Sequence, residues 1–238
     1  MKFINTIQMA YFTVPRPDPI DAAKVWELFY HPNNVDEFRR IPNSPGKQTV
    51  AASTSDKGQI AISSQIGRID VTVSALPDVA DVQPFLENPS AALAELAQKA
   101  DLLRELCPLV RGAFVVNQLF PIEGSPTNMI EERTGAKFPA NSIDPTIQYN
   151  IQVTENGSPP FLVNQISTWS VVSMQLLQFD TSGANPFAVN TDQHLNHKVD
   201  VNTAPNQPLN DVDVVRVFKS LSSRAVARIE NPLSGSDA

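Results

Sequence analysis

Residues 47–74 read KQTVAASTSDKGQIAISSQIGRIDVTVS, and this stretch decides the fold class. Two runs with strand-forming residues, 47–54 and 59–74, flank the turn-forming tetrapeptide Ser-Asp-Lys-Gly. In the second run every other residue becomes aliphatic, at Ile69, Val71 and Val73. This alternation is typical of a strand with one buried face, so the stretch predicts an antiparallel hairpin.

Helices flank the predicted strands. Asn88 and Pro89 supply an N-cap and a first helical position, and apolar residues then recur at spacings of three and four until Pro108, namely Leu93, Leu96, Ala97, Ala100, Leu103 and Cys107. A second long helix is predicted after Asn210, and a short one between Ser125 and Gly135. Together these patterns predict an α+β fold with antiparallel sheet and flanking helices.

A short internal similarity suggests how the chain is divided. Residues 68–73 (RIDVTV) and 198–203 (KVDVNT) share a basic, aliphatic, Asp, Val pattern, and each precedes a loop with proline and a long helix. One interpretation is two similar halves, and the other is chance similarity of a short motif. The predicted division has an N-terminal α+β half, a loop-rich connection, a C-terminal α+β half and a flexible tail, at residues 1–122, 123–145, 146–230 and 231–238.

Composition excludes several functional classes. The formal net charge is -7 and no Lys and Arg run is present, so a nucleic-acid partner is not expected. No stretch of ~18 consecutive apolar residues occurs, so we expect no membrane partner and a cytoplasmic location. Cys107 is the single cysteine, so no disulfide within the chain can form. Glycine-rich phosphate-binding motifs are absent, and no cofactor is predicted.

One histidine-rich segment offers potential metal ligands. Asp192, His194 and His197 lie within six residues, and imidazole and carboxylate groups are common ligands of transition metals. In a helix the two histidines would share a face, whereas in a strand they would point to opposite sides. The grouping supports one hypothesis, a metal-assisted hydrolase, and the alternative is two histidines at the surface or on an edge strand.

Two further segments are candidates for contact with a partner protein. Arg68 and Asp70 lie two residues apart in a predicted strand and therefore share a face, which is either a partner-binding or a solvated face. The segment 163–170 (VNQISTWS) alternates polar and apolar residues. Within it, Asn164 and Trp169 are predicted partner-binding residues, and the alternative for Trp169 is a place in the core.

The segments 163–170 and 198–203 resemble small, sporadically distributed, uncharacterised bacterial proteins, in which an aliphatic, Asp-bearing strand also precedes a C-terminal helix. The resemblance covers at most the C-terminal third and carries over no catalytic residue. It implies an accessory or defence-associated role. With no catalytic motif in the sequence, the leading hypothesis is a non-enzymatic, protein-binding accessory subunit, of which an immunity-type partner is one form. It would act in a bacterial cytoplasm and bind another protein or itself.

Overall fold

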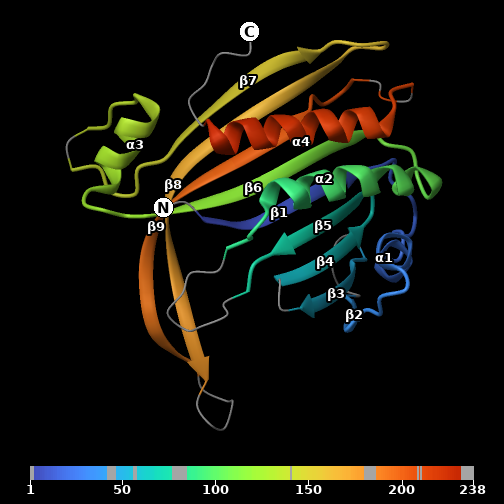
Figure 1. The fold of residues 1–238 in the computed structure, drawn as a ribbon, viewed down its shortest axis with the longest axis horizontal. Coiled ribbons are helices and arrows are strands. Elements are labelled where there is room, and N and C mark those ends of the chain that lie inside the picture. The colour runs from blue at the N-terminus through green and yellow to red at the C-terminus, as the bar shows by residue number, and fades with distance from the viewer. Residues whose placement is uncertain are drawn as a thin grey trace.

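The structure of the chain is a computed structural model (Figure 1). It describes residues 3–41, 47–55, 58–76, 85–139, 141–179, 186–207, 209 and 211–231, and for 174–179 and 186–192 it describes the backbone.

The stretch 47–74 forms three antiparallel strands, β3 (Thr49–Ser55), β4 (Gly58–Gln65) and β5 (Arg68–Ser74). The predicted hairpin is confirmed for β3 and β4. The prediction of one continuous second strand is wrong, because the chain reverses at Ile66 and Gly67. Gly67 has a φ of 75°, a conformation that residues with a Cβ rarely adopt, which is why a glycine stands at this turn.

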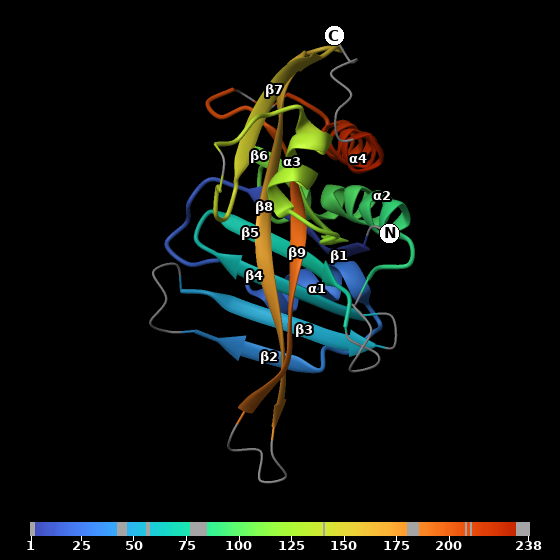
Figure 2. The ribbon, with the colours of Figure 1, turned by 90° about the vertical axis from the view of Figure 1, so that its left-hand side faces the viewer.

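The nine strands that the structure describes form one antiparallel sheet in the order β2-β3-β4-β5-β1-β6-β9-β8-β7. Its remaining strands are β1 (Phe3–Phe12), β2 (Glu37–Arg40), β6 (Arg111–Pro121), β7 (Ile147–Glu155), β8 (Phe161–Phe179) and β9 (Pro186–Thr203). The sheet twists strongly, so that β8 and β9 run nearly across the direction of β3 and β4 when seen from the end (Figure 2).

The four α-helices of the described chain are α1 (Ala22–Tyr30), α2 (Pro89–Lys99), α3 (Pro126–Thr134) and α4 (Val214–Glu230). A 3₁₀ turn, η1 (Ala100–Glu105), continues α2. The predicted starts of α2 at Asn88 and of α3 at Ser125 are confirmed by side-chain caps. For α4 the N-cap is Asp213 rather than Asn210, which lies outside the described residues.

The helices pack against one face of the sheet. Met9, Val71, Phe114 and Val201 stand in register on adjacent central strands and are completely buried under this layer. α4 approaches β6 closely at Gly112, where an added Cβ would lie 3.0 Å from the Phe218 ring. We call this side of the sheet the helix-covered face and the opposite side the helix-free face.

The sheet joins the two predicted halves in one continuous layer. β1–β6 occupy one part of the sheet and β7–β9 the other, and they meet where β6 pairs with β9. The mixed α+β class is therefore confirmed. The connection 123–145 contains α3, and of the predicted flexible tail 231–238 only Asn231 belongs to the described residues.

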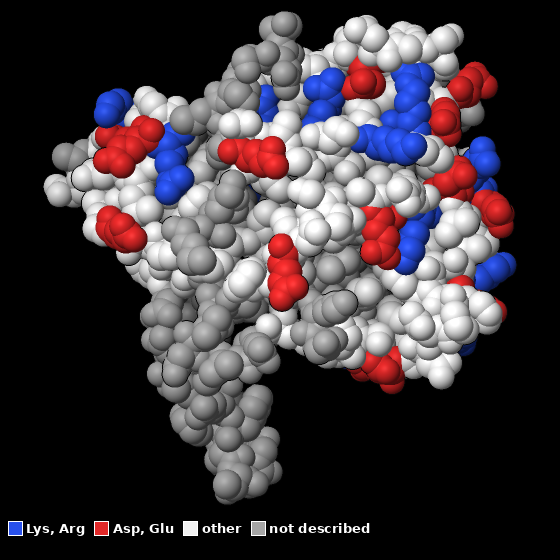
Figure 3. Space-filling view, in the orientation of Figure 1, with Lys and Arg blue, Asp and Glu red and all other residues white. Residues whose placement is uncertain are grey.

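The outer surface of the helix layer carries interspersed charges of both signs, with basic side chains above α4 (Figure 3). None of the described helices combines the length and the apolar character that a membrane crossing requires.

Candidate functional site

Two arginines flank an aromatic ring on the helix-free face. Phe12 at the end of β1 stands in register with Arg68 on one neighbouring strand and with Arg111 on the other. The guanidinium carbons lie 5.0 Å (Arg68) and 5.5 Å (Arg111) from the ring centroid, within the range of cation–π attraction. The ring therefore holds both guanidinium groups close to the sheet.

Arg68 is also held by the carboxylate predicted to share its face. Its Nε lies 2.9 Å from Asp70 Oδ1 and 2.8 Å from Oδ2, and Gln8 donates a further hydrogen bond to Oδ1 at 2.9 Å. Asp70 is buried, so these donors compensate the loss of its hydration. The common face predicted for Arg68 and Asp70 is confirmed.

Arg111 is hydrogen-bonded to the first member of a chain of amide side chains that crosses β9, β8 and β7. Its Nη2 donates to Asn202 Oδ1 at 2.8 Å, and Asn164 donates to the same oxygen at 3.2 Å. Asn202 in turn donates to Asp200 at 2.8 Å, and Gln152 on β7 donates to Asn164 at 2.9 Å. We call these connected side chains the polar ladder: Gln8, Phe12, Arg68, Asp70, Arg111, Gln152, Asn164, Asp200 and Asn202.

A hollow of about 420 Å³ opens beside the two arginines. It lies at the end of the sheet where β1 ends, β4 turns into β5, β6 begins and β9 leads into its following loop. Apolar residues form much of its lining, together with both guanidinium-bearing side chains: Phe12, Pro15, Ile66, Val110 and Pro205, with Arg68 and Arg111. Such a mixture suits a small ligand with an apolar body and an anionic group.

β8 and β9 extend beyond the rest of the sheet at its other end. β7 pairs with β8 only as far as Trp169, and β6 pairs with β9 only from His194 onward. Residues 173–179 and 186–193 consequently pair with each other alone within the described chain, as the projecting ribbon in Figures 1 and 2. We call these two segments the arm.

The predicted metal ligands do not converge. β9 is a strand, so His194 and His197 lie on opposite faces, His197 on the helix-covered and His194 on the helix-free side. The Asp192 side chain lies outside the described residues. Among the described side chains, no three His, Cys, Asp or Glu residues come together as a metal site would require.

His197 belongs to a buried cluster beneath α3. Its ring stacks on Trp169 with centroids 4.1 Å apart, and its Nδ1 lies 3.2 Å from Gln118 Oε1. Burial, together with the smaller effect of the nearby positive charges of Arg133 and Arg228, lowers the pKa of His197 to about 3. The imidazole is therefore neutral at physiological pH. The surface position considered from the sequence is wrong for His197, which is completely buried.

Trp169, predicted as a partner-binding residue, is completely buried in the same cluster. Its ring packs against Phe120, with Ile130 of α3 and Leu195 completing the cluster. The core position is therefore confirmed and the exposed anchor is wrong, because the even spacing from Val163 brings Trp169 to the helix-covered face. Asn164, by contrast, lies on the helix-free face, and its partner-binding role stays a prediction.

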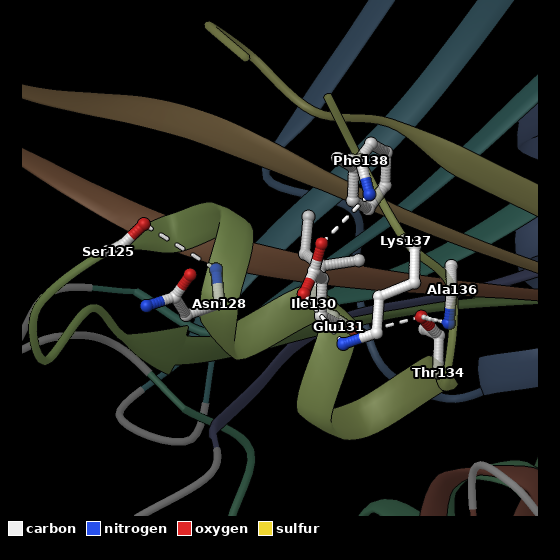
Figure 4. A network of polar contacts seen from close by, with 8 residues as sticks. All are labelled: Ser125, Asn128, Ile130, Glu131, Thr134, Ala136, Lys137 and Phe138. Atoms are coloured by element: carbon white, nitrogen blue, oxygen red, sulfur yellow. Dashed lines mark hydrogen bonds and ion pairs between the residues drawn. The ribbon is translucent and has the colours of Figure 1, made fainter. Parts of the chain in front are cut away.

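Local polar contacts fix α3 above this cluster (Figure 4). Glu131 accepts from the Phe138 backbone N–H at 2.8 Å and pairs with Lys137 at 3.0 Å. The hydrogen bond from Phe138, followed by that from Lys137, lowers the pKa of the Glu131 carboxyl. The helix ends at Gly135, whose left-handed conformation confirms the predicted stop.

Sequence reasoning missed Phe12, Arg111 and Asn202. Arg111 and Asn202 are 91 residues apart, and no local pattern indicates that their strands are neighbours. A signal was nevertheless present for Asn202. It lies two residues after Asp200 in the 198–203 motif, so an alternating strand places both side chains on one face.

Comparisons of the chain with protein-family models, curated proteins and solved structures found no match. The geometry of the helix-free face and the arm is therefore the basis for the functional proposals below.

Proposed function

We propose that the chain is a non-enzymatic, protein-binding accessory subunit and that the arm docks onto a partner protein. The arm is the single observation that carries this proposal. Two-stranded ribbons are marginally stable in water, and a ribbon of this kind gains neighbours when another protein binds along it. By the resemblance stated above, the setting is a bacterial cytoplasm.

The backbone edges of the arm support a β-strand mode of recognition. Residues 173–179 have no neighbour on the β7 side and residues 186–193 none on the β6 side, within the described chain. Each edge leaves backbone N–H and C=O groups available to an added strand. An extended segment of the partner pairing with one edge would satisfy them.

The composition of the arm favours a protein partner. Its segments read SMQLLQF and PFAVNTDQ, with Asp192 as their single charged residue. Natural proteins usually protect exposed edge strands with charged residues, lysine above all, or with prolines. Apart from Pro186 and Asp192 the two segments have neither, which is typical of a contact surface. The net charge of -7 makes nucleic acid a poor partner for the same surface.

The alternative of a metal-assisted hydrolase has less support. It requires His194 and His197 to ligate one ion, and opposite faces of β9 separate their rings. His197 is also completely buried against Trp169, which leaves no path for a substrate.

Photo-crosslinking in the native host tests the proposal. A photoreactive phenylalanine analogue replaces Phe187 in the arm, and a matched variant carries it at Phe85, an exposed aromatic residue outside the arm. We expect a discrete crosslinked protein from position 187 that is absent from position 85. Identical crosslinks from both positions, or a chain that stays monomeric and uncrosslinked at native expression, would contradict a partner at the arm.

We also propose that the two halves are related by duplication. This repeat divides the chain before β6 rather than at residue 122, the boundary expected from the sequence, and strand, helix, meander and helix follow one another in each part. The first part holds β1, α1, β2–β5 and α2, and the second holds β6, α3, β7–β9 and α4. The last meander strand returns beside the first strand each time, as β5 beside β1 and β9 beside β6. An experimental structure in which β1, β5 and α2 fail to superpose on β6, β9 and α4 would contradict this relationship.

A further inference from the structure

We propose that the hollow beside Arg68 and Arg111 binds a carboxylate, with Arg111 as the group that recognises it. This site lies at the opposite end of β9 from the arm, so the inference goes beyond the proposed function and stands independently of it.

The charge balance at the hollow leaves one positive charge available. Asp70 neutralises Arg68 through contacts of 2.8 and 2.9 Å. Arg111, by contrast, bonds to the neutral amide of Asn202, and no carboxylate of the described residues forms an ion pair with it. A single uncompensated guanidinium balances the charge of one monovalent anion, whereas a dianionic phosphate would keep a second negative charge without a partner, which the overall charge of -7 also disfavours.

Arg111 has hydrogen-bonding capacity that the surrounding protein does not use. Its Nε is buried and has no hydrogen-bond partner. A buried N–H without a partner is costly, and in native proteins such a group usually bonds to a ligand or an ordered water. The Nε and a terminal nitrogen of one guanidinium form the planar fork that binds both oxygens of a carboxylate. Because the Nε has almost no exposed surface in the free chain, a carboxylate forms this two-point contact only when the side chains around the Nε shift on binding.

The guanidinium is held in place before a ligand arrives. Phe12 lies under it at 5.5 Å from ring centroid to guanidinium carbon, and Asn202, completely buried, fixes one of its nitrogens at 2.8 Å. Less side-chain freedom is therefore lost on binding, which favours affinity. The apolar walls at Pro15, Val110 and Pro205 would contact the hydrocarbon part of the ligand.

Two sources could supply such a group, a small organic acid or the C-terminal carboxylate of a polypeptide. The test uses phenylacetate and the peptide N-acetyl-Ala-Ala-Phe as probes, each beside its amide, which has the same shape and no charge. Binding to the full chain is followed through the ¹H–¹⁵N resonance of Arg111 Nε, identified as the signal lost in Arg111→Gln.

We expect at least one carboxylate probe to shift this resonance and its amide to leave the resonance unchanged. By calorimetry, Arg111→Gln should weaken binding of the same probe about tenfold or more, the loss of a charge-assisted pair. The control Arg39→Gln removes an exposed arginine on β2, paired with Glu37 at 2.7 Å, and should retain full affinity. Phenylacetate alone would indicate a small acid, and the peptide alone would indicate a polypeptide terminus.

Three results would overturn the proposal: equal binding of an acid and its amide, tighter binding of inorganic phosphate than of either acid, or unchanged calorimetric affinity in Arg111→Gln. Failure of both acids to bind at millimolar concentration would do the same. A circular-dichroism melt of each variant shows whether it is folded, and Arg111→Lys, which keeps the charge without the fork, serves as a second variant. None of these outcomes bears on crosslinking at the arm, so the two proposals fail separately.

Discussion

The two faces of the central sheet are stabilised in different ways. On the helix-covered face, Met9, Val71 and Phe114 are completely buried by an apolar layer. On the helix-free face, Gln8, Asp70 and their neighbours are ordered by hydrogen bonds to one another. The difference indicates that burial beneath the helices carries most of the folding free energy, and that the polar ladder keeps the other face ordered without a covering layer. That face and the arm are therefore available for binding.

The largest expected effect comes from a large-to-small change beneath α4. Phe218 is completely buried and contacts the rings of Tyr11 and Phe114, with centroids 5.9 and 5.8 Å away. Phe218→Ala should lower the free energy of unfolding by about 3–5 kcal/mol. Phe12→Ala on the half-buried, helix-free side should cost less than about 2 kcal/mol, because less apolar area is lost from burial. Denaturant unfolding measures both, and equal losses would contradict the comparison.

The hub of the polar ladder should give a smaller loss. Asn202→Ala removes the acceptor of Arg111 and Asn164 and the donor to Asp200, and buried groups left without partners cost about 1–3 kcal/mol. The matched control is Asn196→Ala, on the same strand and face, where the side-chain Oδ1 has no partner to lose. If both substitutions cost the same, the ladder does not stabilise the helix-free face.

A pH-dependent effect on stability tests the burial of His197 on the helix-covered face. Burial lowers the pKa of His197 to about 3, below its ordinary value of 6.5. The unfolded chain therefore binds a proton that the folded chain does not, and stability is full above pH 6.5 and falls as the pH drops toward 3. Between pH 6.5 and 5, the wild type should lose about 1–2 kcal/mol more than His197→Gln. Parallel stability curves for the two proteins would show that His197 is not buried in its neutral form.

Local patterns were enough to predict the fold class and several element ends. Ser125 and Gly135 bound α3 as predicted, since capping chemistry acts within a few residues. The turn at Gly67 was missed because a single glycine between two strand-like runs resembles a bulge as much as a reversal.

The candidate site was predictable only in part. Arg68 and Asp70 share a face because successive side chains of a strand point to opposite faces, and this prediction needs no knowledge of the sheet order. The contact between Arg111 and Asn202 depends on β6 lying beside β9, a long-range pairing that no local signal specifies. Trp169 is buried because it lies on the side of the sheet that the helices cover, and which side they cover is also a property of the whole fold.

The central claim, that binding and folding are carried by different parts of the sheet, is tested most directly by removing the arm. Residues 173–193 are replaced by Asn-Gly, a two-residue turn that joins the paired Val172 and His194. We predict that the free energy of unfolding stays within about 1 kcal/mol of the wild type, since the arm pairs only with itself in the described chain, and that the protein crosslinked at position 187 no longer copurifies. An armless chain that unfolds, or that still retains this partner, would contradict the account.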